Sequence, residues 1–319
     1  MGIRLRLRGL QRCPMLKAVF RWILVLAALL LVGPLLGSLL GFGTTAIGAR
    51  GTTIFIGTRP VGTLLGALAT MSGAAALGLI GARFMARDMG YMVAGIVLSW
   101  AAWHLGLIQN IIQAQPVDAK VGTIWGTLAA EHAMLAALGL GLAMAIERLG
   151  SNDHGQPMTT PDPALTLGER IKSRFLEETP DAKPIAVSLG GSIVTGAILA
   201  GALASLIVYE SLKGQTVMGV ALAALGAGAG SQIIASMLGV RLTPLMPIAA
   251  TLVVSIVAPI VGMVTLKDPV LAATSGHFLG MLRPTSLDWA AGAFLGAPIG
   301  IAWANSMLER PAVVGAKPA

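Results

Sequence analysis

Three ionisable residues stand inside long apolar stretches of this sequence, namely His104, Glu131 and His132. An ionisable side chain near the centre of a bilayer costs about 3 kcal/mol or more, so such residues commonly mark a functional site. A carboxylate beside an imidazole can exchange a proton or hold a cation. These three residues are therefore the first candidates for a functional site that binds a proton or a cation.

The spacing of the three residues predicts that they lie at one depth. His104 precedes Pro116 by twelve positions, and Glu131 follows Pro116 by fifteen. At a rise of about 1.5 Å per residue, both lie roughly 20 Å along their helices from a turn at Pro116. Because a short turn makes the two helices neighbours, we expect His104 to face Glu131 or His132 near the midplane.

Three interpretations of this cluster stay open. The residues could form a structural polar pair that locks two helices. They could instead form the proton- or cation-coupling site of a transporter or channel. In the third interpretation, His104 and His132 are axial ligands of a b-type haem. The sequence lacks a second histidine pair and a haem-binding motif, so we expect no cofactor, with b-haem as the minority alternative.

Composition shows which elements must position these residues. The 319 residues are 55% hydrophobic and only 11% charged, with a mean hydropathy of +0.80. A soluble domain has about a quarter of its residues charged, so this chain cannot cover a surface in water. The composition excludes a soluble enzyme and predicts an integral membrane protein in contact with the lipid bilayer.

Apolar stretches of about 20 residues are long enough to cross a bilayer as helices. Eight stretches qualify or nearly qualify, and they cover residues 22–42, 60–82, 89–113, 121–146, 185–209, 216–240, 244–266 and 289–308. They lack the alternation of barrel strands, and backbone groups in lipid must be satisfied within the segment. The prediction is an all-α polytopic transmembrane bundle of about eight helices.

The polar segments divide the chain into five parts. These are a basic N-terminus at 1–18, a first four-helix half at 19–146, a linker at 147–184, a second four-helix half at 185–308 and a tail at 309–319. Within the linker, the apolar residues recur at roughly helical spacing and predict a short amphipathic surface helix. Those residues are Leu165, Leu167, Ile171, Phe175 and Leu176.

Lysine and arginine predict the orientation of the chain. Alternate loops carry sixteen basic residues on one side and six on the other, out of 22. Basic residues accumulate on the cytoplasmic side, so we expect both termini and the linker in the cytoplasm of a cell with an inner membrane. The first apolar stretch is longer than a signal-peptide core, and Arg21 stands at its cytoplasmic edge, which favours a retained helix.

Two stretches suggest a tandem duplication. Residues 116–128 and 269–282 both read P-V-x-A and then G-x-x-x-G-x-L when one gap is allowed. Four spans in each half would relate the copies by an axis along the membrane normal. The fourteen apolar residues at 269–282 are too short to span, so they predict either a re-entrant half-helix or an interfacial helix.

Glycines four positions apart predict a close helix contact. Gly292, Gly296 and Gly300 recur along the last apolar stretch. Small residues let helix backbones approach closely in lipid, so we expect these glycines to serve helix packing within the chain. A contact in a homo-oligomer or a channel wall is the alternative.

The remaining motifs exclude several functions. Glu131-His132 is not the H-E-x-x-H of a zinc protease, the single cysteine forms no metal cluster, and no phosphate-binding loop occurs. Aromatic residues are few and are not interleaved with basic ones, which excludes a nucleic-acid platform. We therefore expect a protein that is not an enzyme.

A transporter or channel-like protein that moves a small solute or ion, with or without proton coupling, is the leading prediction. The alternative is a non-catalytic subunit or scaffold of a larger membrane complex. An electron-transfer subunit that holds b-haem comes third.

Overall fold

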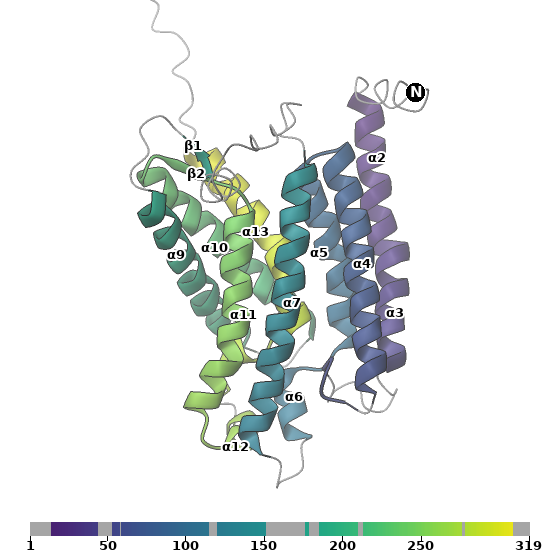
Figure 1. Ribbon diagram of the computed structural model, residues 1–319, viewed down its shortest axis with the longest axis vertical. Helices are drawn as coiled ribbons and strands as arrows, with labels where there is room; N and C mark the ends of the chain where they lie inside the picture. Colours follow the sequence, from purple (N-terminus) through teal and green to yellow (C-terminus); the bar gives the residue numbers. More distant parts are fainter. Residues whose placement is uncertain are drawn as a thin grey trace, which may run out of the picture.

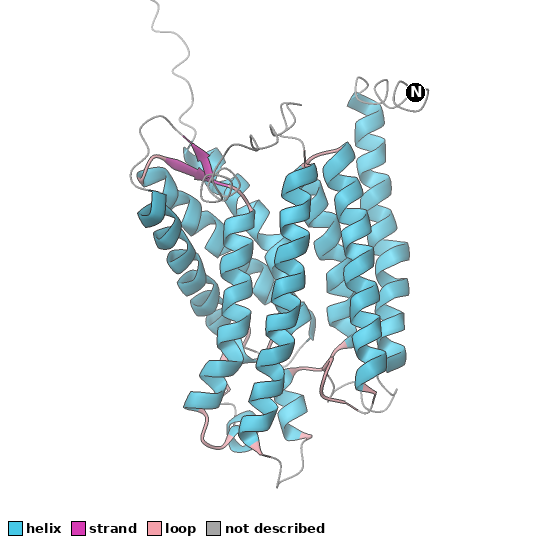
Figure 2. Cartoon of the chain, in the orientation of Figure 1, coloured by secondary structure: helices cyan, strands magenta, loops and turns pink. Residues whose placement is uncertain are grey.

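The protein is a bundle of long helices, shown by the computed structural model in Figures 1 and 2. The structure describes residues 14–43, 53–57, 59–114, 120–150, 176–178, 185–209, 213–275 and 278–308. Within these residues, eight helical spans are long and apolar enough to cross a membrane. The predicted all-α transmembrane bundle is confirmed.

The elements follow one another along the two halves. The first half contains α2 (Pro14–Ala27), the π-helix η1 (Ala28–Val32), α3 (Gly33–Gly43), α4 (Pro60–Phe84), α5 (Arg87–His104), α6 (Ile108–Gln113) and α7 (Val121–Leu149). The second half contains α9 (Ile185–Ile207), α10 (Lys213–Met237), α11 (Leu245–Thr265), α12 (Pro269–Thr274), the 3-10 turn η3 (Gly280–Leu282) and α13 (Ser286–Leu308). The short strands are β1 (Leu176–Glu178) and β2 (Val240–Leu242).

Helices from the two halves are packed together at the centre. The third long helix of each half packs against the fourth helix of the other, as α5 against α13 and α7 against α11. Helix α13 also packs along α10. Gly292, Gly296 and Gly300 lie in this contact, where an added Cβ would meet backbone atoms of α10. Close van der Waals packing is what associates helices in lipid, so these glycines hold α13 in the core.

The third apolar stretch is interrupted. It was predicted as one helix, but α5 ends at His104 and α6 begins at Ile108 after three buried non-helical residues. Gly106 lies in this break, and glycine costs about 1 kcal/mol relative to alanine inside a helix. The Ile108 amide donates to the Arg283 carbonyl at 3.3 Å. A neighbouring segment thus supplies a hydrogen-bond partner to a backbone group at the break in the helix.

The same order of a long helix, a short helix and a long helix occurs in both halves. The short helices α6 and α12 pack together, and the Gln109 and Gln113 amides donate to the Ala273 carbonyl at 2.6 and 3.1 Å. The two stretches matched in the sequence do not occupy equivalent elements, because one runs into α7 and the other covers α12 and η3. The tandem repeat stays a prediction.

The segment after α12 returns into the protein. Phe278, Gly280 and Leu282 are buried in a stretch that is mostly not helical. An added Cβ at Gly280 would lie 2.6 Å from the Ser205 and Val208 carbonyl oxygens, so only glycine permits this approach to the end of α9. This segment leads directly into the buried first residues of α13.

A short ribbon replaces part of the predicted linker helix. Leu176–Glu178 forms β1, which pairs antiparallel with β2 between α10 and α11. Leu176 was expected in an amphipathic helix, and that expectation was wrong because the backbone of β2 offers a strand edge for pairing. The other residues of the predicted helix lie outside the described part of the chain.

The contact between α10 and α13 predicts a position-specific effect of an added methyl group. Gly296→Ala places a Cβ against the Ala221 carbonyl, whereas Gly126 on α7 has nothing within 4 Å of an added Cβ. Overpacking costs about 1–3 kcal/mol, so Gly296→Ala should lower the melting temperature in detergent, and Gly126→Ala should leave it nearly unchanged. Equal melting temperatures for both variants would contradict the packing described.

Candidate functional site

Glu131 is a completely buried carboxylate on α7. It lies ten residues after the start of the helix, which corresponds to about 15 Å along the helix axis. Its Oε1 accepts a hydrogen bond from the Ser286 hydroxyl at 2.7 Å, and its Oε2 accepts one from the Phe55 amide at 3.1 Å. Among the residues that the structure describes, no lysine or arginine forms an ion pair with it.

The Phe55 amide comes from a tight turn between α3 and α4. The Thr53 amide donates to the Ile56 carbonyl at 2.8 Å, and the Thr53 hydroxyl accepts from the Ile56 amide at 3.2 Å. This turn leaves the amide of Phe55 free to point at Glu131. The loop therefore supplies a hydrogen-bond donor to Glu131 without supplying a charge.

Ser286 is placed by the start of α13, which forms a capping box. The Thr285 amide donates to Asp288 Oδ2 at 2.7 Å, and the Asp288 amide points back to the Thr285 hydroxyl at 3.5 Å. This reciprocal arrangement fixes the first turn of a helix. The positive end of the helix dipole then lies beside both Glu131 and Asp288, where it favours negative charge.

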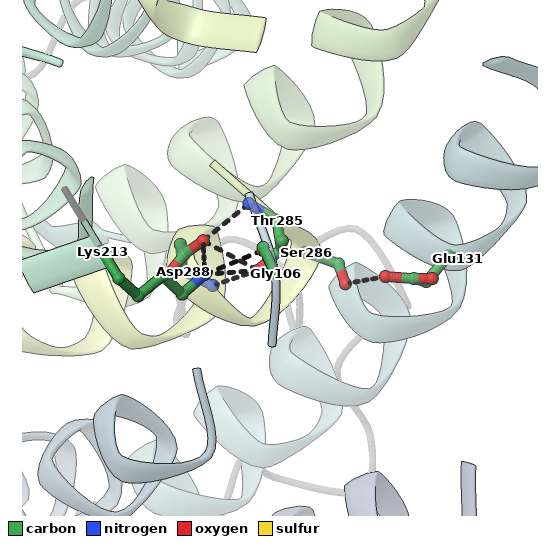
Figure 3. A network of polar contacts seen from close by, with 6 residues as sticks. All are labelled: Gly106, Glu131, Lys213, Thr285, Ser286 and Asp288. Atoms are coloured by element: carbon green, nitrogen blue, oxygen red, sulfur yellow. Dashed lines mark hydrogen bonds and ion pairs between the residues drawn. The ribbon is translucent and has the colours of Figure 1, made fainter. Parts of the chain in front are cut away.

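Lys213 extends the site to α10. Its ammonium donates to Asp288 Oδ2 at 2.6 Å, to the Gly106 carbonyl at 3.4 Å and to the Thr285 hydroxyl at 3.5 Å. Figure 3 shows these side chains in a line that runs from α10 across the start of α13 to Glu131 on α7. We call Lys213, Asp288, Thr285, Ser286 and Glu131 the polar network.

Three non-helical segments meet at the polar network. They are the turn at 53–57, the break at 105–107 and the stretch that precedes Ser286. Non-helical backbone at membrane depth is tolerated only where it is buried in protein or lines a water-filled cavity. Leu105, Gly106 and Leu107 are all buried. The site therefore lies where a break inside one candidate span meets two segments that connect spans.

The two histidines do not join this network. His104 Nδ1 lies 2.9 Å from the Trp100 carbonyl of its own helix, and its ring lies against Gly37 of α3, where an added Cβ would be 3.0 Å from Cε1. The expectation that His104 faces Glu131 or His132 was therefore wrong. The rotation of α5 points His104 toward α3.

His132 points from α7 toward α11. Its Nδ1 lies 2.6 Å from the Ser255 carbonyl, which can only accept, so Nδ1 carries the proton of this bond. Nε2 is buried and has no hydrogen-bond partner within the described residues. The two imidazoles thus have different neighbours, and these contacts do not bring them together as a pair of haem ligands.

A second buried acid on α7 has a different environment. Glu147 forms an ion pair with Arg87 at 3.4 Å and accepts a hydrogen bond from the Tyr91 hydroxyl at 2.8 Å. The sequence predicts Glu147 as the first residue of the linker at 147–184, whereas the structure places it within α7. The Arg87 partner gives Glu147 a fixed counter-charge that Glu131 lacks.

Sequence reasoning identified Glu131 but missed its partners. Ser286 and Asp288 were placed before the last span because that span was counted from residue 289. The T-x-x-D spacing at Thr285–Asp288 could have indicated a helix start there. No protein-family model matches the chain, no curated protein matches it, and no solved structure matches it. The site is therefore interpreted from its own geometry.

The hydrogen bond between Ser286 and Glu131 predicts a measurable loss of stability. Ser286→Ala leaves Glu131 Oε1 without its partner, and an unmade hydrogen bond to a buried group costs about 1–3 kcal/mol. Ser286→Thr keeps a hydroxyl and is the matched control. The melting temperature in detergent should fall clearly for alanine and little for threonine, and equal values for the two variants would contradict this contact.

Proposed function

We propose that this integral membrane protein is a transporter that moves protons, alone or together with a small solute, and that Glu131 is the proton-binding side chain. One observation carries the proposal. A completely buried carboxylate within a candidate membrane-spanning helix is held by neutral hydrogen-bond donors, at the meeting point of three non-helical segments.

The partners of Glu131 suit both of its protonation states. The ionised carboxylate accepts hydrogen bonds from the Ser286 hydroxyl and the Phe55 amide. After Glu131 takes up a proton, its O–H can donate to the Ser286 oxygen, because a hydroxyl rotates and also accepts. Proton binding therefore requires little rearrangement. Glu147 differs from Glu131 because Arg87 places a positive charge beside its carboxylate.

The interrupted helices favour a transporter over a scaffold subunit. In many transporters, substrate and coupling-ion sites lie near the bilayer midplane and are formed by discontinuous helices. Here the break between α5 and α6 and the buried start of α13 meet within one network. The proposal requires no cofactor.

Proton flux into liposomes tests the proposal. Purified protein is reconstituted with a pH-sensitive dye inside, and valinomycin with a potassium gradient makes the interior negative. Acid is then added outside, with and without a mixture of amino acids, carboxylates, sugars and nucleosides. We expect acidification well above that of empty liposomes, because Glu131 passes protons through the bundle.

Two substitutions on α7 separate the role of Glu131 from the effect of losing any buried acid. Glu131→Gln should reduce the flux to the level of empty liposomes while the protein stays folded. Glu147→Gln removes the other buried carboxylate of α7 and should retain flux. A wild-type flux equal to that of empty liposomes, or full flux in Glu131→Gln, would refute the proposal and favour the structural interpretation of the site.

We further propose that the protein lies in the inner membrane with both termini in the cytoplasm, as the basic residues predict. The turn before α7 then faces outward and the end of α7 faces the cytoplasm. In a Cys13→Ser background, a membrane-impermeant maleimide should label Lys120→Cys in intact cells. It should label Arg148→Cys only after permeabilisation, and the reverse pattern would invert the topology.

A further inference from the structure

We propose that the oxygen atoms around Lys213 form a binding site for a monovalent alkali cation, which exchanges with the Lys213 ammonium. The inference rests on the transport function proposed for Glu131, and it names the class of ion that moves with or against the proton. It concerns a different part of the polar network, at the junction of α10, α13 and the break after α5.

The donor atoms around Lys213 are those that a hard cation prefers. The ammonium contacts a carboxylate oxygen of Asp288, the carbonyl oxygen of Gly106 and the hydroxyl oxygen of Thr285. Carboxylate, carbonyl and hydroxyl oxygens are hard ligands, and unwound backbone carbonyls coordinate sodium in transporters. Gly106 contributes such a carbonyl, because it lies in the non-helical break between α5 and α6.

One carboxylate oxygen of Asp288 has no partner in the described part of the chain. The residue is completely buried, and its Oδ2 receives the bonds from Lys213 and Thr285. Its Oδ1 is buried and has no hydrogen-bond partner among the residues that the structure describes. A buried carboxylate oxygen without a partner is costly, and a metal cation can bind both oxygens of one carboxylate. Lys213 therefore contacts only one of the two carboxylate oxygens of Asp288.

The charge of the site selects a monovalent ion. If the ammonium leaves, the buried carboxylate of Asp288 loses its only ion-pair partner among the described residues. Removing one partner of a buried ion pair is strongly destabilising, so the site favours another cation in place of the ammonium. One sodium or potassium ion restores the same charge, whereas a divalent ion adds one positive charge beside the positive end of the α13 dipole.

Lys213 is positioned to withdraw without unfolding a helix. It is the first residue of α10, and its side chain remains 14% exposed although Asp288 is fully buried. The four-carbon stem of lysine is flexible, so the ammonium can move to solvent while the backbone of α10 stays in place. The exchange breaks hydrogen bonds but no covalent bond, and it leaves the net charge of the site unchanged.

Cation binding would be communicated directly to Glu131. Asp288 is bonded to Thr285, and the adjacent Ser286 is bonded to Glu131. Both carboxylates therefore hold the same turn of α13. A shift of that turn when Lys213 is replaced by an ion changes the hydrogen bond to Glu131, which supplies a physical link between the cation and the proton.

Equilibrium binding of radioactive sodium and rubidium to detergent-purified protein tests the inference, with choline chloride keeping the ionic strength constant. Rubidium is the probe for a potassium-like site. We expect saturable binding of one of the two ions to the wild-type protein. Lys213→Gln should bind that ion at least about tenfold more tightly, because the competing ammonium is gone. Asp288→Asn should abolish binding.

Matched variants keep the test decisive if Asp288→Asn does not fold. Thr285→Val removes one oxygen and should weaken binding, whereas Thr285→Ser keeps the hydroxyl and should not. The absence of saturable binding of either ion to wild-type protein would overturn the inference, as would equal binding by the two Thr285 variants. Binding is measured without flux, so saturable binding by a wild-type protein that shows no proton flux would refute the proposed function and leave the cation site standing.

Discussion

The structure depends on one constraint, which is that the carboxylate of Glu131 must be hydrogen-bonded although it is completely buried in the bundle. The Phe55 amide in the turn at 53–57 and the hydroxyl of Ser286, the first residue of α13, meet that need. Because backbone without helical hydrogen bonds is tolerated within a membrane protein only where it is buried in protein or lines a water-filled cavity, the surrounding helices have to close over the segments that meet here. The packing of the bundle and the chemistry of the site are therefore consequences of the same requirement.

Helix α13 connects the packing to the site. Its glycines bring it into backbone contact with α10, and the start of α10 supplies Lys213 to the capping box of α13. A small-residue contact that stabilises the core thus also sets the distance between Lys213 and Asp288. Near the end of α7, Glu147 has a fixed partner in Arg87, so the two buried acids of that helix have different electrostatic surroundings. One acid is held in an ion pair, and the other is held by neutral hydrogen-bond donors.

Features that depend on composition and on short sequence patterns could be predicted from the sequence. Eight spans could be recognised because each crossing needs about 20 apolar residues, and Glu131 was notable as the only acid within them. The orientation of His104 could not be predicted, because the rotation of α5 is set by contacts with α3. Phe55 gave no signal, because its contribution is a backbone amide. Lys213 and Asp288 were counted as flanking charges, since their pairing joins residues 75 positions apart.

The central claim, that buried Glu131 exchanges a proton, is tested most directly by infrared difference spectroscopy of the reconstituted protein during a pH change. We expect a carbonyl stretching band of a protonated carboxylic acid that appears on acidification and is absent from Glu131→Gln. In Ser286→Ala, the same band should shift, because the hydrogen bond to the acid is lost. A wild-type spectrum without such a band, or one that Glu131→Gln leaves unchanged, would contradict the account.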